Sequence, residues 1–203
     1  MSVVVAGMSM SLDGFIAGPN DGVGNPLGDG GERLHEWVVR LRSWRRAHGL
    51  EGGETGPDDE LFARSFDATG AFVMGRRMFD LGEGPWGEEP PFHKPVFVVT
   101  HRPRDPVVKE GRTTFTFVDG IESALEQARA ASDGGDVGVG GAQTIRQLLS
   151  AKLLDEIQLQ LVPVFLGGGV RLFDDLSPGA AELECAEAIE SGGVAHLRFR
   201  VVK

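Results

Sequence analysis

Short apolar runs that end in glycine or a polar turn recur along this chain, and most are followed by a helical pattern. The first run, Val3–Met10, stops at Asp13-Gly14, as expected of a buried strand that ends in a turn. Ala71–Met74 and Pro95–Thr100 are apolar without alternation, which is typical of strands covered on both faces. This order of strands and helices predicts an α/β fold with a largely parallel sheet.

Helical signals lie between these runs. Residues 33–48 carry Leu34, Trp37, Val38 and Leu41 at helical spacing, which predicts a helix after the Gly-rich loop 20–31. A second helix is expected to begin near Asp58, and a third near Asp119, with Asp119 as N-cap and Glu122 completing a capping box. A fourth is expected over Gln143–Leu149.

The C-terminal part has a different periodicity. Apolar residues alternate with polar ones over Ile157–Leu161 and again over Leu197–Val201, which predicts antiparallel strands. We therefore expect one three-layer α/β/α domain over residues 1–203, with a mixed, mostly parallel sheet and an antiparallel C-terminal hairpin.

Charge and composition exclude several classes of partner. A formal net charge of −10 argues against nucleic acid, because phosphate contacts need clustered Lys and Arg. No apolar stretch approaches the ~18 residues of a membrane span, and the N-terminus has no basic segment of a signal peptide, so we expect a cytoplasmic protein. The single Cys185 is expected to be a small buried side chain, and the five scattered histidines predict no metal site.

Four strand ends carry residues that could meet a ligand. Gly75-Arg76-Arg77 joins a strand to a helix, which suits phosphate as well as a tight turn with solvated arginines. Thr100-His101-Arg102 could hold a 2′-phosphate or be a polar strand terminus. Gly140-Gly141 precedes a helix but is not the GxGxxG of a dinucleotide-binding Rossmann unit, and Gly167-Gly168-Gly169 favours a structural turn.

The order of these motifs resembles the dihydrofolate reductase-like fold, and more closely the reductase domain of the bifunctional riboflavin-biosynthesis deaminase-reductase. The resemblance rests on short motifs in the same order along almost the whole chain: Ser11–Ala17, Met74–Arg77, Val139–Ala142, Leu153–Glu156 and Pro163–Gly169. The zinc-deaminase pattern HxE…PCxxC is absent, so this chain lacks a deaminase half.

This resemblance implies NADPH as the hydride donor and a small pyrimidine-, pterin- or flavin-related substrate, as in 5-amino-6-(5-phosphoribosylamino)uracil reductases, with a C=N or C=O bond reduced. The implied cofactor contacts lie at the strand ends and in the first loop: Ala17, Gly75, Arg76, Arg77, Thr100, His101, Arg102, Gly140, Gly141, Ala142, Gln143 and Thr144. Met78 departs from the family, because dihydrofolate reductases usually have threonine there.

The proton donor and the substrate pocket are less defined by the motifs. Asp59 lies on the helix that carries the acid in dihydrofolate reductases, and Asp13 lies in the loop expected near the nicotinamide, so both are candidate catalytic residues. Helix-end charge explains Asp59 equally well. Trp37 and Trp86 are candidate substrate contacts, with core packing as the alternative for Trp37 and a role in an interface for Trp86.

The motifs support two hypotheses about the function. The first is an NADPH-dependent reductase; the alternative is a catalytically weak NADPH-binding protein of the same fold with a sensing or assembly role. Solitary domains of this type are commonly homodimers, which is the partner we expect besides the small-molecule substrate. The physiological substrate is not specified by the motifs, because residues 18–56 resemble the family least.

Overall fold

A computed structural model describes residues 2–177 and 179–203 of the chain. It divides the chain into two compact units, one formed by residues 1–3 and 37–138 and the other by residues 4–36 and 139–203. Each unit is described below by itself. The expectation of a single domain over residues 1–203 stays a prediction.

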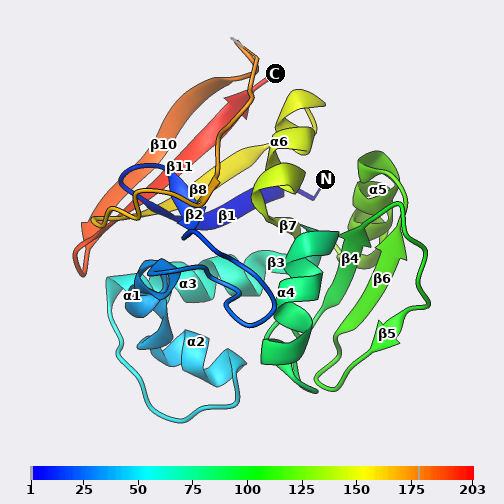
Figure 1. Cartoon of the computed structure of the whole chain (residues 1–203), viewed down its shortest axis with the longest axis horizontal. Helices are drawn as coiled ribbons and strands as arrows, with labels where there is room; N and C mark the ends of the chain where they lie inside the picture. Colours follow the sequence, from blue (N-terminus) through cyan, green and yellow to red (C-terminus); the bar gives the residue numbers. More distant parts are fainter. Residues whose placement is uncertain (1, 178) are drawn as a thin grey trace. The chain divides into compact units, whose positions relative to one another are not determined.

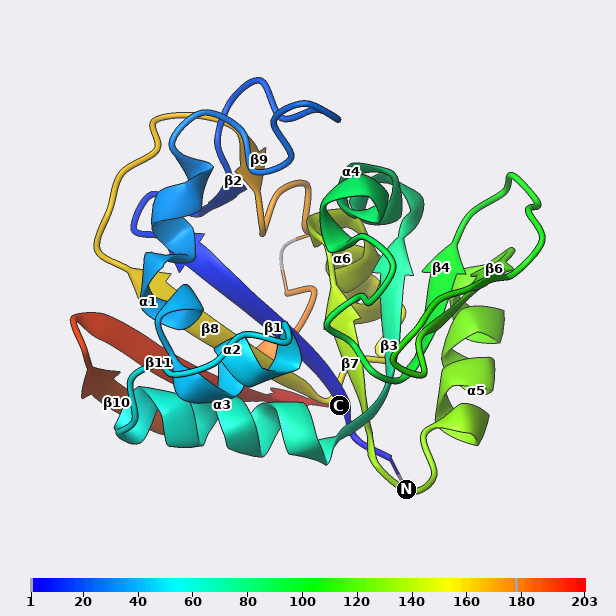
Figure 2. The same ribbon diagram turned by 90° about the horizontal axis from the view of Figure 1, so that it is seen from below.

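The unit formed by residues 37–138 is an α/β structure. Its strands hydrogen-bond in the order β3, β4, β6, β5, with β3–β4 and β4–β6 parallel and β5–β6 antiparallel. Helices α4 and α5 lie on opposite sides of these strands (Figures 1 and 2). The elements of this unit are α2 (Arg42–Ala47), α3 (Pro57–Ala68), β3 (Thr69–Gly75), α4 (Arg76–Trp86), β4 (Pro95–Val99), β5 (Val107–Val108), β6 (Thr114–Val118) and α5 (Ile121–Ala131).

The core of this unit is aromatic. Phe79 of α4 and Phe115 of β6 are fully buried and meet edge to face, with ring centroids 5.0 Å apart. The indole of Trp86 stacks on Phe115 at 5.9 Å and meets Phe92 at 4.9 Å, and Met78 packs against the same cluster. Met78, Phe79 and Trp86 therefore hold α4 on the strands. The charged residues of α4 described below lie elsewhere on the same helix.

The second unit combines parallel and antiparallel pairing. β1 pairs with β8 in parallel, and β8, β11 and β10 follow in antiparallel order. A separate two-stranded sheet joins β2 to β9, which lie about 150 residues apart in sequence. Its elements are β1 (Val4–Ser11), β2 (Phe15–Ala17), η1 (Gly31–Leu34), α6 (Ala142–Ser150), β8 (Glu156–Val162), β9 (Val170–Arg171), β10 (Glu182–Ser191) and β11 (Val194–Val202), while α1 (Glu36–Val39) and β7 (Asp136–Gly140) carry residues of both units.

The expected mixed α/β architecture and the antiparallel C-terminal strands are confirmed, but the single helix over residues 33–48 is wrong. The chain there forms η1, α1 and α2, with Leu41 in an extended conformation and only 2% exposed. The cause is pairing across the break: Arg42 N donates to Glu54 O and Glu54 N donates to Arg40 O, both at 2.8 Å. These bonds hold the chain straight where a continuous helix would need an α-helical Leu41.

Two smaller expectations are also wrong. The N-cap of α5 is Gly120, with φ 88° and no side-chain cap, because Asp119 faces His101 instead, with His101 Nδ1 and Asp119 Oδ1 2.6 Å apart. Cys185 is exposed rather than buried, since the first four residues of β10 are all exposed. Residues on both faces of the strand are exposed at this end of β10, so an apolar side chain there is not buried.

Candidate functional site

The predicted phosphate site begins at two neighbouring strand ends. β3 and β4 run parallel and in register, with Gly75 opposite Val99, so Gly75-Arg76 and Thr100-His101-Arg102 leave the sheet at the same edge. Ligands of open α/β sheets gather at this edge. The strand register therefore brings the two predicted motifs to one edge of the sheet.

The turn after β4 is shaped by Thr100. Its backbone N donates to Val118 O at 2.9 Å, which ends the pairing with β6. Its hydroxyl oxygen accepts a bond of 3.1 Å from the backbone N of Arg102, so the side chain bends the chain into a short turn. Thr100 is buried, whereas Arg102 beyond the turn is exposed.

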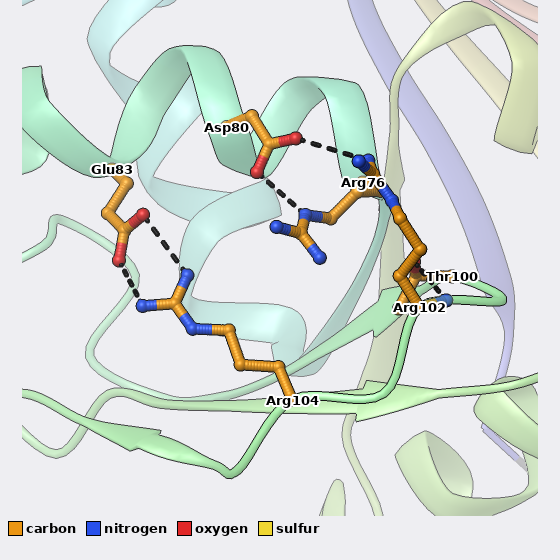
Figure 3. A network of polar contacts seen from close by, with 6 residues as sticks. All are labelled: Arg76, Asp80, Glu83, Thr100, Arg102 and Arg104. Carbon is orange, nitrogen blue, oxygen red and sulfur yellow. Dashed lines mark hydrogen bonds and ion pairs between the residues drawn. The ribbon is translucent and has the colours of Figure 1, made fainter.

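Two arginines and one aspartate meet beside this turn, as Figure 3 shows. Arg76 Nε donates to Asp80 Oδ1 at 2.6 Å, one helical turn along α4, and Arg102 Nη2 lies 3.5 Å from Asp80 Oδ2. The guanidinium of Arg76 also lies 5.6 Å from the ring centroid of Phe117. Two guanidinium groups held next to each other at a helix start suit an anionic ligand with several oxygens.

A second ion pair borders this group. Arg104 Nη1 and Nη2 donate to the two carboxylate oxygens of Glu83 at 3.2 and 2.8 Å, and its guanidinium lies 5.3 Å from the centroids of Phe79 and Phe117. The bond to Glu83 raises the pKa of Arg104 above its ordinary value. Arg104, Asp80 and Glu83 were missed by the sequence reasoning, although the i,i+4 spacing of Arg76 and Asp80 is a signal of an ion pair on a helix.

The remaining cofactor candidates of this unit are Gly75, Arg77 and His101. Arg77 is exposed on α4, and His101 is exposed beside Asp119. The N-cap of α4, Gly75, has no side chain that could cap the backbone N–H groups of the first turn. The assignment of Gly75, Arg77 and His101 to the cofactor stays a prediction.

In the other unit, the turn from β7 into α6 has the form expected of Gly140-Gly141. Gly141 is the N-cap with φ 89°, a conformation that favours glycine, and no side chain caps the helix. Ala142 and Thr144 are buried in the first turn of α6, and Gln143 is exposed. Their assignment to a cofactor pyrophosphate is not tested by this geometry.

Asp13 is held as a carboxylate by its neighbours. It accepts hydrogen bonds from the Ser11 hydroxyl at 2.6 Å, from Gly167 N at 2.8 Å and from Leu166 N at 3.2 Å. The Ser11 bond first, and then the two backbone bonds, lower the pKa of Asp13 to about 2. Asp13 thus joins the loop after β1 to the loop before β9, and it carries no proton to donate at neutral pH.

Gly169, the last of the three glycines before β9, lies at a close approach of two backbone segments. Gly169 has φ 115°, and its Cα faces the backbone of Ala17 and Gly18, where a Cβ would overlap the carbonyl oxygen of Ala17. Gly18 in turn has no space for a Cβ against Asp29. Ala17, a cofactor candidate, is buried at this crossing of backbone segments.

Asp59 lies in the first turn of α3 and is only 8% exposed. Its Oδ1 accepts a bond of 2.7 Å from the backbone N of Ser43 in α2. Its Oδ2 has no hydrogen-bond partner within residues 2–177 and 179–203. The protein therefore fixes one oxygen of this carboxylate by a hydrogen bond.

The two candidate substrate tryptophans are packed against the protein. Trp37 is 7% exposed, and the ring of Trp86 belongs to the aromatic core around Phe115. Their substrate contacts stay predictions. Within the described part of the chain, residues 2–177 and 179–203, no group of three His, Cys, Asp or Glu side chains is placed to hold a metal ion. Among the helices of those same residues, none is long and apolar enough to cross a membrane.

Comparison with known proteins places this geometry in context. The structure matches a putative riboflavin biosynthesis protein from Shewanella sp. PV-4 with a TM-score of 0.71 and 21% identity, covering 99% of each chain. It also matches dihydrofolate reductase from Enterococcus faecalis, solved with NADP(H) and RAB-propyl, with a TM-score of 0.55 and 16% identity over 99% of this chain and 97% of that one. These likenesses confirm the dihydrofolate reductase-like fold.

A search of curated proteins gave no significant match. The family description of the RibD C-terminal domain matches residues 2–197, which is nearly the whole chain and includes every motif on which the resemblance rested. The chain belongs to the RibD C-terminal domain family.

Proposed function

We propose that this protein is a reductase that uses NADPH to reduce a C=N or C=O bond of a small heterocycle related to pyrimidines, pterins or flavins. Membership of the RibD C-terminal domain family supports a reductase role in riboflavin-type chemistry. The dihydrofolate reductase-like fold, which in the Enterococcus faecalis protein is solved with NADP(H), supports a nicotinamide cofactor.

The observation that carries the proposal is the pair of arginines at the ends of β3 and β4. A 2′-phosphate is a dianion at neutral pH, and guanidinium groups bind such oxygens with paired hydrogen bonds. Arg76 and Arg102 come from different strand ends, yet both lie within 3.5 Å of the same carboxylate. The two guanidinium groups are thus held beside one another, where a phosphate next to Asp80 could contact both.

The residues of this site would hold the cofactor, and the bound cofactor would supply the hydride. Arg76 and Arg102 would bind the 2′-phosphate, and the Thr100 hydroxyl would keep Arg102 in place by bending the turn. The side chain of Phe117 would support the guanidinium plane of Arg76. In the other unit, the uncapped first turn of α6, from Gly141 to Thr144, has by itself the chemistry of a phosphate-binding helix start, and its part in cofactor binding stays a prediction.

Asp59 is the acid best suited to the substrate. Its Oδ2 has no partner in the described chain, so it could accept a hydrogen bond from a ring N–H or amino group of the heterocycle. Asp13 is a weaker candidate, because its oxygens already accept three bonds within the protein. Its catalytic role nevertheless stays a prediction that only a variant can test.

The proposal is tested by titrating the protein with NADPH and NADH and measuring thermal stabilisation, which rises as the ligand exceeds its Kd. We expect NADPH to bind, and Arg76→Ala and Arg102→Ala each to weaken its binding by about ten- to a hundredfold, because each removes a charged hydrogen-bond donor. Arg46→Ala, at an exposed arginine of α2, is the matched control and should leave binding unchanged. Binding that is unaffected by both site variants would mean that the cofactor lies elsewhere.

The alternative, an NADPH-binding protein with weak turnover, is favoured by one observation. The pKa of Asp13 is lowered to about 2, so one of the two candidate acids carries no proton to donate at neutral pH. The two functions differ in NADPH oxidation with pyrimidine, pterin and flavin acceptors. Turnover with any of them supports the reductase, whereas tight NADPH binding without oxidation supports the alternative.

A homodimer remains our proposal for the assembly. β10 ends the strand order next to β11, and Leu183 on it is 47% exposed. An exposed apolar edge strand is a common place for pairing between copies. Sedimentation equilibrium at micromolar concentration is the test, and a monomer mass would end the proposal.

A further inference from the structure

Asp80 occupies an unusual position for a carboxylate in a site proposed to bind an anion. Its two oxygens face different arginines, Oδ1 toward Arg76 Nε at 2.6 Å and Oδ2 toward Arg102 Nη2 at 3.5 Å (Figure 3). It follows that the acid lies between the two cations whose positive charge a phosphate would need. Arg76 and Arg102 carry two positive charges, and Asp80 reduces the net charge of the three residues to one.

Fold stability gives little reason for this arrangement. The Asp80 side chain is 36% exposed, and those of Arg76 and Arg102 are 22% and 72% exposed. An i,i+4 pair and an exposed pair of this kind each contribute less than about 1 kcal/mol to stability. α4 is instead held on the sheet by its buried side, where Phe79 is fully buried. The acid is therefore explained better by what it does to a ligand than by what it does for the helix.

A carboxylate acts in opposite ways on the two forms of an adenosine ribose. It repels a 2′-phosphate, but it can accept a hydrogen bond from a free 2′-hydroxyl, the contact that acidic residues make in NAD sites. The arginines favour the phosphate. The three residues thus offer a partner to either form of the ribose. Arg76 and Arg102 could bind a 2′-phosphate, and Asp80 could accept a hydrogen bond from a free 2′-hydroxyl.

We propose that Asp80 is a specificity-determining residue, which lowers the preference of this site for a 2′-phosphorylated adenosine and lets the protein accept NADH as well as NADPH. This inference rests on the proposed function, because it requires that the nucleotide binds at Arg76 and Arg102. Asp80 on α4 would then limit the selectivity of the site between NADPH and NADH.

The test uses two small probes that differ only in the 2′-phosphate, adenosine 2′,5′-bisphosphate and adenosine 5′-monophosphate. Their Kd values are measured by isothermal titration calorimetry with the wild-type protein and with Asp80→Asn at ~0.05 M salt, where charge effects are weakly screened. We expect Asp80→Asn to tighten the bisphosphate by about tenfold, since it removes a like charge from the neighbourhood of a dianion, and to change the monophosphate by less than about twofold. The gain should shrink at about 0.5 M salt.

Glu83→Gln is the matched control. Glu83 lies one turn along the same helix, its side chain is also 36% exposed, and it pairs with Arg104. The variant changes the net charge of the protein by the same amount, so a general charge effect would appear in both variants. We expect less than a twofold change of either Kd for Glu83→Gln.

Each outcome has a definite meaning. An unchanged or weaker affinity of Asp80→Asn for the bisphosphate overturns the inference while leaving the arginine site in place, and so does an equal gain in Glu83→Gln. If wild-type protein binds neither probe and no NADPH, the proposed cofactor site fails and this inference fails with it. Asp80→Ser, which cannot repel the phosphate either, repeats the test if the thermal unfolding of Asp80→Asn shows that this variant is not folded.

Discussion

Asp59 Oδ1 accepts a 2.7 Å hydrogen bond from the backbone N–H of Ser43, so an acid in the first turn of α3 also caps the first turn of α2. Asp59→Asn retains an oxygen that can accept this bond, whereas Asp59→Ala removes it. We expect Asp59→Ala to lower the free energy of unfolding by about 1 kcal/mol, the usual cost of a lost cap, and Asp59→Asn to lower it by less. Chemical denaturation of both variants measures this difference.

The same two variants separate the structural role of Asp59 from a catalytic one. A carboxylate that handles the substrate proton is expected to contribute about 10²–10⁴-fold to the rate, and the amide of Asp59→Asn cannot replace it. Both variants should then lose turnover to the same extent despite their different stabilities. Full turnover by Asp59→Asn would show that Asp59 has only a structural role, through its bond with Ser43. Asp58→Asn is the control for the loss of a neighbouring carboxylate.

Gly82 leaves room for the indole of Trp86. A Cβ at Gly82 would overlap the six-membered ring of Trp86, which is itself stacked on Phe115 and cannot easily move. Although alanine is preferred over glycine in a helix by about 1 kcal/mol, we expect Gly82→Ala to destabilise the protein by roughly 1–3 kcal/mol. Thermal unfolding followed by tryptophan fluorescence reports both the stability and the displaced ring.

Gly84→Ala is the control for this substitution. Gly84 lies in the same helix, and apart from its chain neighbours and the nearby backbone of that helix, nothing in the described chain is within 4 Å of the position of its Cβ. Alanine is favoured over glycine in a helix, but the ring of Pro85 disfavours a Cβ on the helical residue before it, so we expect Gly84→Ala to change the stability by less than about 1 kcal/mol. Equal effects of the two substitutions would show that Trp86 is free to move.

The fold was predictable wherever one periodicity extends over a whole element. Unalternated apolar residues identified β3 and β4, and alternation identified β8 and β11. The two-stranded sheet of β2 and β9 could not be predicted, because strands of three and two residues have no period and their partners lie far apart in sequence. The helix break at Leu41 was equally hidden, since it depends on pairing with Glu54 rather than on any local breaker.

The candidate site was predictable in outline for a related reason. Arg76 and Arg102 follow neighbouring parallel strands, and the carboxyl ends of such strands meet at one edge. The pairing of Arg104 with Glu83 was not accessible, because Arg104 lies beyond Pro103 in a segment without a regular pattern. The role of Asp13 was obscured because both its backbone donors, Leu166 and Gly167, are more than 150 residues away in sequence.

The bonds of Asp13 predict a dependence of stability on pH. Because the pKa of Asp13 is lowered from 3.8 to about 2 in the folded protein, its stabilising contribution is complete above pH ~4 and is lost as the pH falls from 3.8 toward 2. Asp13→Asn lacks this contribution. We therefore expect the variant to unfold at a lower temperature than the wild type at pH 7, and the difference to shrink as the pH is lowered to about 2.

The control for this measurement is Asp105→Asn, at an exposed aspartate in the loop after β4. It removes one carboxylate and the same charge without touching Ser11, Leu166 or Gly167. A difference from the wild type that stays constant between pH 5 and 2 for Asp13→Asn would contradict the proposed source of its low pKa.

Two glycines before β9 separate the cost of backbone conformation from the cost of close packing. Gly167 has φ 72° with open space around its Cβ position, whereas Gly169 has φ 115° and its Cβ would overlap the backbone of Ala17 and Gly18. Gly167→Ala should therefore cost only about 1 kcal/mol of unfolding free energy, the penalty of a left-handed alanine. Gly169→Ala should cost at least about 3 kcal/mol, because a backbone crossing cannot relax by a change of rotamer. Urea denaturation of the two variants measures both costs, and similar values would mean that the segment around Ala17 yields to the added methyl group.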